Sequence, residues 1–121
     1  MTEANAQSAE VLCKDGMDLL AAGSAAEAAR SFRAAITADE DCFEAHHGLV
    51  RALRDAGRLE QSIGAALALT ALTPQDPLAH TALSISLQRA GHIPEAEAAA
   101  AKARVLEWKL ALQSPREGSE L

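Results

Sequence analysis

The chain has 121 residues, of which 49% are hydrophobic and 2% aromatic, and it carries a formal net charge of −6. Because alanine and leucine favour helices whereas strands favour aromatic and β-branched residues, this composition predicts one small helical domain. The acidic balance disfavours a nucleic-acid binder or an anionic membrane surface as partner, and no apolar run reaches the ~20 residues that span a bilayer.

The N-terminus and the cysteines suggest where the protein works. The opening stretch "MTEANAQSAE" lacks the basic and apolar regions of a secretory signal, and we interpret residues 1–8 as a disordered tail. Cys13 and Cys42 fit free thiols in a reducing compartment better than a disulfide framework. We therefore expect a cytoplasmic protein.

Six helical segments follow in chain order, and most are bounded by a recognisable signal. Asp76 is placed as an N-cap before Pro77, because its carboxylate can accept a backbone hydrogen bond and proline suits the first turn. Gly23, Gly57 and Gly91 stand where a left-handed residue closes a helix. The expected helices cover residues 9–22, 25–38, 43–56, 59–72, 77–90 and about 94–114.

The three closing glycines are spaced 34 residues apart. A period of this length predicts a stacked array in which each unit is one pair of helices. The units are residues 9–42, 43–76 and 77–110, and residues 111–121 hold the end of the last helix and a polar tail.

Equivalent positions of the three units carry similar side chains. Small residues predominate at positions 8 and 20, where the two helices of a unit touch, and leucine recurs at position 11. These residues are Gly16, Val50 and Ser84, then Ala28, Ser62 and Ala96, then Leu19, Leu53 and Leu87. The pattern resembles the tetratricopeptide repeat, a 34-residue helix–turn–helix. The resemblance implies an all-α, right-handed superhelical α-solenoid of three repeats with an extended C-terminal helix.

The same resemblance implies a concave groove that binds extended or helical peptides. In repeat two, His47, Arg51 and Arg54 share the helix face that the partner helix does not use. Carried to all repeats by position, the candidate peptide-binding residues are Cys13, Met17 and Leu20, then His47, Arg51 and Arg54, then Thr81, Ile85, Gln88 and Arg89.

Charge on this face indicates what a ligand would carry. Arg51, Arg54 and Arg89 stand out in an acidic chain, and arginine pairs well with carboxylates. We expect a ligand segment with an acidic residue or free C-terminus near the groove centre and an apolar anchor against Met17 and Leu20. The alternative is that the arginines are solvated or paired with a local acid.

The last helix is a second candidate interaction surface. Trp108 stands where the repeat usually has proline, so nothing stops the helix until about Ser114 and Pro115. Its candidate oligomer seam is Val105, Trp108 and Leu112. Either this end folds back on its own array, or it forms a homodimer seam or docks on another protein.

The sequence shows no constellation of catalytic residues, so we expect no enzyme, no cofactor and no metal. His46 and His80 share one repeat position, and we expect each to pack between helices with one hydrogen bond. The predicted function is a non-catalytic protein-interaction module, an adaptor or a chaperone-like protein. Size, acidity and repeat number resemble bacterial chaperones of secretion-system subunits, and equally repeat proteins without an assigned role. The alternative is a self-associating scaffold.

Overall fold

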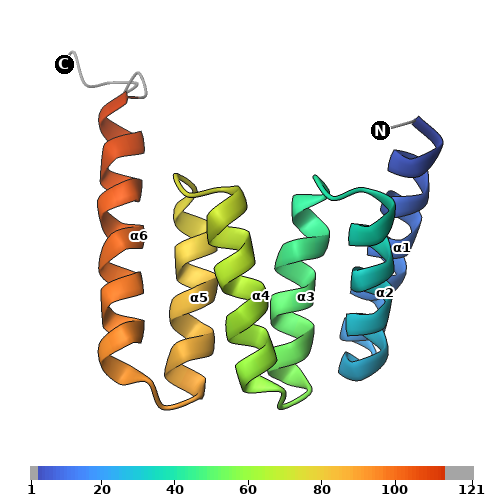
Figure 1. Ribbon diagram of the computed structural model, residues 1–121, viewed down its shortest axis with the longest axis horizontal. Helices are drawn as coiled ribbons and strands as arrows, with labels where there is room; N and C mark the ends of the chain where they lie inside the picture. Colours follow the sequence, from blue (N-terminus) through green and yellow to red (C-terminus); the bar gives the residue numbers. More distant parts are fainter. Residues whose placement is uncertain (1–2, 114–121) are drawn as a thin grey trace.

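The computed structural model describes residues 3–113, and within this range it contains six α-helices and no strand. Consecutive helices run in opposite directions and form a row of three hairpins (Figure 1). The helices are α1 (Glu3–Ala21), α2 (Ala25–Ala38), α3 (Phe43–Asp55), α4 (Leu59–Leu72), α5 (Pro77–Arg89) and α6 (Ile93–Gln113). The predicted all-α solenoid of three hairpins with a long last helix is confirmed. None of these six helices combines the length and apolar character that a membrane crossing requires.

The N-terminal expectation needs a correction. The tail predicted over residues 1–8 is helical from Glu3 onward, so α1 starts before the predicted repeat boundary at residue 9. The physical reason is that this stretch is rich in alanine, a strong helix former, and that Ala9 is buried at the end of it. At the other end α6 continues to Gln113, and the predicted stop at about Ser114 lies outside the described residues.

The recurring glycines close the first helix of each hairpin as predicted, with φ of 84° at Gly23, 78° at Gly57 and 88° at Gly91. At Gly57 the amide donates to the Arg54 carbonyl at 3.0 Å, and the next amide, from Arg58, donates to the Leu53 carbonyl at 2.8 Å. This pair of bonds is the Schellman arrangement, and it requires a left-handed residue that glycine adopts without strain. The same two bonds recur at Gly23 and Gly91, which explains why a glycine recurs at this position of each 34-residue unit.

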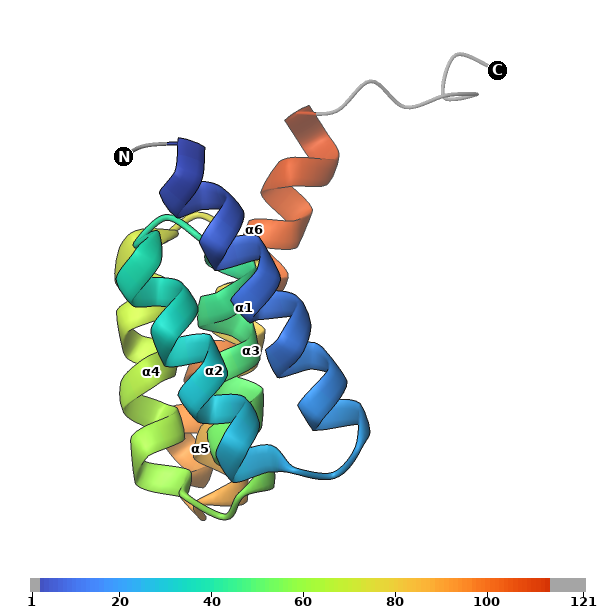
Figure 2. The same cartoon turned by 90° about the vertical axis from the view of Figure 1, so that its right-hand side faces the viewer.

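Three helices form the inner wall of the array. Among the described helices α1 packs against α3, and α3 packs against α5, whereas the backbones of α2, α4 and α6 do not pack on one another. A side-chain hydrogen bond still links α2 to α4, because Arg33 donates to Oε1 of Gln61 at 3.3 Å. In the view of Figure 2, α2 and α4 lie on the left side and α1 on the right. When the first helix of each hairpin packs against the first helix of the next hairpin and the second helices stay further apart, the row curves toward its first helices. The inner wall is therefore built from α1, α3 and α5.

Phe32 joins the first hairpin to the second. Its side chain on α2 is fully buried, and its ring lies against Gly16 of α1 and Gly48 of α3. A Cβ atom at either glycine would lie less than 3.0 Å from ring atoms of Phe32. Both glycines are therefore required by close approach, and one aromatic ring fills the space where three helices meet.

At the second junction, between the second and third hairpins, the large and small side chains exchange places. One repeat further along the chain, Ala66 takes the place of Phe32, and Val50 and Ala82 take the places of the two glycines. Ala66 and Val50 are buried in one cluster, and Ala82 packs against it. Val50, which is larger than Gly16 at the equivalent position of repeat one, is thus compensated by the small Ala66 across the junction.

A chain of polar contacts also crosses the second junction. The hydroxyl of Ser62 on α4 donates to the Val50 carbonyl on α3 at 2.8 Å and lies 2.7 Å from the hydroxyl of Ser86 on α5. Both serines are fully buried, and Arg54 donates to the Ser86 hydroxyl at 3.4 Å. Because buried hydroxyls are costly without partners, this network fixes how α3, α4 and α5 sit against one another.

We predict that Gly48→Ala lowers the free energy of unfolding by about 1–3 kcal/mol, because the added methyl overpacks the Phe32 ring. Gly64→Ala is the matched control: Gly64 is exposed on α4 with no atom within 4 Å of its would-be Cβ, so we expect a gain of about 0.5–1 kcal/mol. Urea unfolding followed by circular dichroism measures both. Equal stability of Gly48→Ala and the parent would disprove the close-approach argument.

Candidate functional site

A hollow of about 500 Å³ opens on the inner wall between α1 and α3. It lies where the first two repeats meet, and the residue that caps the start of α5 closes one side of it. The lining residues are Met17 and Leu20 from α1, Phe43, Glu44, His47, Gly48 and Arg51 from α3, and Asp76 before α5.

The apolar part of the hollow is open to solvent. Met17 and Phe43 are 50% and 44% exposed, and Leu20 is half-buried against the core. Gly48, the same glycine that accommodates Phe32, also lines the hollow. Exposed methionine and aromatic side chains around a concavity are a typical surface for binding an apolar group.

Charged groups surround this apolar part unevenly. Glu44 and Asp76 place carboxylates on the rim. Arg51 adds a guanidinium and pairs with Asp55 one turn along α3, with 3.7 Å between Nε and Oδ2. This exposed pair realises the alternative in which an arginine is held by a local acid.

Arg54 and Arg89 extend the basic character toward α5. Arg54 is half-buried, and burial lowers its pKa from the ordinary value, with the neighbouring charge of Arg89 acting in the same direction. Among residues 3–113, no carboxylate forms an ion pair with either arginine. Two neighbouring cations on the inner wall thus lack a carboxylate partner of their own, and they could receive one from a ligand.

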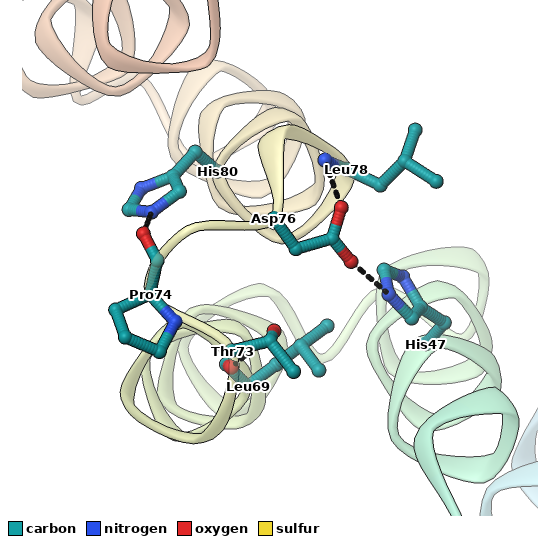
Figure 3. A network of polar contacts seen from close by, with 7 residues as sticks. All are labelled: His47, Leu69, Thr73, Pro74, Asp76, Leu78 and His80. Carbon is teal, nitrogen blue, oxygen red and sulfur yellow. Dashed lines mark hydrogen bonds and ion pairs between the residues drawn. The ribbon is translucent and has the colours of Figure 1, made fainter. Parts of the chain in front are cut away.

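His47 connects the hollow to the next repeat (Figure 3). The Asp76 carboxylate accepts the Leu78 amide at 3.0 Å, which confirms the predicted N-cap, and its second oxygen lies 4.0 Å from Nε2 of His47. Burial lowers the pKa of His47 below its ordinary value, while Asp76 acts in the opposite direction and His46 adds to the lowering. The imidazole is therefore neutral near pH 7.

The structure brings together four of the ten predicted groove residues, Met17, Leu20, His47 and Arg51, around this hollow. The remaining predicted residues lie elsewhere. Cys13 is buried and lines a neighbouring hollow of about 570 Å³, and Gln88 lines a small hollow between α5 and α6. Thr81, Ile85 and Arg89 lie further along α5 and Arg54 faces Ser86, outside the hollow.

Sequence reasoning missed four lining residues: Phe43, Glu44, Gly48 and Asp76. A signal for two of them was present, because Glu44, His47, Gly48 and Arg51 follow the i, i+3, i+4, i+7 spacing of one helix face. Asp76 was recognised only as a cap, since its approach to His47 depends on how two repeats stack.

His46 and His80 each form the one hydrogen bond that was predicted, but their partners are carbonyls of the preceding turn rather than groups of a neighbouring helix. Nε2 of His46 lies 2.9 Å from the Glu40 carbonyl, and Nε2 of His80 lies 3.0 Å from the Pro74 carbonyl (Figure 3). A carbonyl only accepts, so both histidines donate from Nε2, and each ties the start of a hairpin to the turn before it. Within residues 3–113, no three His, Cys, Asp or Glu side chains converge as metal ligands would.

We predict unequal reactivity of the two cysteines. Burial raises the pKa of the Cys13 thiol to about 11 from an ordinary value of 9.0, so at pH 8 it forms about 100-fold less thiolate. Ellman's reagent should therefore modify Cys42 quickly and Cys13 only in denaturant, as followed in Cys13→Ser and Cys42→Ser variants. Equal rates for the two thiols in the folded protein would contradict the burial of Cys13.

We also predict the titration of His47. Its imidazole should titrate below the ordinary value of 6.5, and Asp76→Asn should lower the pKa further because the carboxylate's attraction for the proton is removed. Asparagine also caps helices well, so α5 is preserved. Imidazole NMR resonances followed against pH measure both shifts, and an upward shift in the variant would refute the pairing.

Comparison with known proteins agrees with this architecture. The fold resembles that of the Yersinia enterocolitica type III secretion translocator chaperone SycD in an alternative dimer, with a TM-score of 0.79 and 19% identity over 87% of this chain and 80% of that one. It also resembles a structure described as MamA MSR-1 C2, with a TM-score of 0.76 and 22% identity over 84% of this chain and 58% of that one.

Sequence comparison gives the family directly. No curated protein matches the chain. A family model of the tetratricopeptide repeat matches residues 13–77, which is more than half of the chain. The three helical hairpins, the left-handed glycines that close them and this match lead to one conclusion: the chain belongs to the tetratricopeptide repeat family.

Proposed function

We propose that the protein is a non-catalytic interaction module that binds a segment of another protein along the inner wall of α1, α3 and α5. The observation that carries this proposal is the open hollow between α1 and α3, where Met17 and Phe43 expose about half of their surface on the inner wall. Exposed apolar side chains that gather around a hollow on a concave wall are what a binding surface for an apolar group requires.

The order of apolar and charged side chains along the inner wall indicates which groups the ligand carries. One large apolar side chain enters the hollow against Met17, Leu20 and Phe43. The carboxylates of Glu44 and Asp76 repel an acidic group at the rim of the hollow itself. An acidic side chain or C-terminal carboxylate therefore lies further along, near Arg54 and Arg89, where it supplies the missing counter-charge.

The comparisons support an adaptor or chaperone role of this kind. The similar Yersinia protein is described as a translocator chaperone, a protein that serves another protein. The resemblance to the tetratricopeptide repeat implies a groove that binds peptides, and this implication supports the same role. We place the bound segment in the groove and the protein in the cytoplasm as parts of this proposal.

A displayed library of random peptides with free C-termini tests the binding mode. We expect selected peptides to share one large apolar residue followed or preceded by an acidic residue. Met17→Glu should weaken their binding at least about tenfold, because it puts a charge into the apolar hollow. Arg89→Glu should weaken peptides with the acidic residue and leave neutral variants of the same peptides unchanged. Isothermal titration calorimetry measures each affinity.

Val11→Glu is the matched control. Val11 also lies on α1 and is 60% exposed, but it lines a shallow hollow with Leu12 away from the groove. The affinity of Val11→Glu for the selected peptides should stay within about twofold of the parent value. Equal loss in Met17→Glu and Val11→Glu, or no selected peptides at all, would count against the groove as the binding surface.

A further inference from the structure

The long last helix leaves one complete face without a partner. Among the described helices α6 packs against α5 alone, through Ala96, Ala99, Ala103 and Leu106. The end predicted either to fold back or to form a seam does not fold back: α6 runs past the end of α5 (Figure 1), and Trp108 and Leu112 are 64% and 61% exposed.

The face opposite α5 carries a continuous apolar stripe. Its members alternate four and three residues apart, which is the spacing of a coiled-coil seam rather than that of a helix laid on a globular core. The stripe consists of Pro94, Ala98, Ala101, Val105, Trp108 and Leu112, and all six are exposed. The stripe contains the three predicted seam residues, Val105, Trp108 and Leu112. It adds three further residues toward the N-terminus of α6.

Charged residues flank this stripe on both sides. Glu95 and Lys102 follow seam residues on one side, and Glu97 and Arg104 precede seam residues on the other. All four are exposed. Each side thus has an acidic residue near the start of α6 and a basic residue seven positions later, so a second α6 running in the opposite direction matches acid to base on both sides.

We propose that this face binds a second copy of the chain, with the two α6 helices antiparallel and Ala98 opposite Ala101 of the second copy. In this register Glu95 faces Lys102 of the second copy and Glu97 faces Arg104 of the second copy. The two-fold symmetry repeats both contacts, so four ion pairs border the seam and no like charges meet.

Other alignments of the same stripe juxtapose like charges. If the two antiparallel helices were centred with Ala101 opposite Val105, Lys102 would face Lys102 of the second copy, and Arg104 would face Arg104 of the second copy. If they were parallel, Arg104 would face Lys109 of the second copy. Of these three alignments, only the proposed register pairs Glu95, Glu97, Lys102 and Arg104 each with an opposite charge, and charge is what selects register in such seams.

Side-chain sizes agree with this register. The centre of the seam is formed by Ala98 and Ala101, which let the helices approach closely. Trp108 lies one turn beyond the last apolar pair, past Ile93, where α6 of the second copy begins.

Analytical ultracentrifugation over a wide concentration range tests the proposal on the full chain. The parent should form a dimer. Glu95→Lys should raise the dissociation constant at least tenfold, because it places Lys opposite Lys102 twice. Combining Glu95→Lys with Lys102→Glu should restore the parent value, since it exchanges the two charges. The pair Glu97→Lys with Arg104→Glu gives an independent rescue, and circular dichroism verifies that α6 stays helical.

Lys109→Glu is the control. In the proposed register Lys109 lies beyond Ile93, where α6 of the second copy begins, and faces no charged residue of that helix. The dissociation constant of Lys109→Glu should therefore stay at the parent value, whereas in the centred register Lys109 faces Glu95 and the variant's dimer would weaken. A monomer at every concentration overturns the proposal. So does a dimer that Val105→Glu leaves intact, or one that neither charge exchange restores.

Discussion

The contact of Phe32 with Gly16 and Gly48 is the constraint on which the inner wall depends. The buried ring brings α1, α2 and α3 together, and the absence of a Cβ at both glycines sets how closely α1 and α3 approach. The hollow between Met17 and Phe43 lies above the same Gly48. One packing arrangement therefore stabilises the first junction and leaves the cavity that we assign to the ligand.

The two junctions between repeats solve one problem in different ways. The first uses a large ring against two glycines, and the second uses Ala66 against Val50 together with the buried hydroxyls of Ser62 and Ser86. A polar junction orients Arg54, because Ser86 accepts its hydrogen bond. The apolar first junction and the polar second junction thus divide the inner wall into an apolar part and a basic part. The proposed ligand contacts both parts.

The groove and the face of α6 are separate surfaces with separate chemistry. The groove lies on α1 and α3, whereas the exposed apolar stripe lies on the face of α6 opposite its buried residues. The helix α6 stands at the far end of the row from α1 (Figure 1). A second copy joined through α6 leaves both grooves open and places two of them in one particle. Two linked sites bind a ligand with two matching segments more tightly than either site alone.

The sequence by itself determined the helices, their order and the turns between them. These features rest on short-range hydrogen bonds and on the φ of single residues, such as the Schellman bonds around Gly57 and the cap at Asp76. Only the tertiary structure decided which side chains meet across repeats: Asp76 beside His47, Ser62 against Ser86, and Cys13 buried rather than lining the groove. The physical reason is that these contacts depend on the rotation and spacing of neighbouring hairpins, and those follow from the summed sizes of buried side chains rather than from any local pattern.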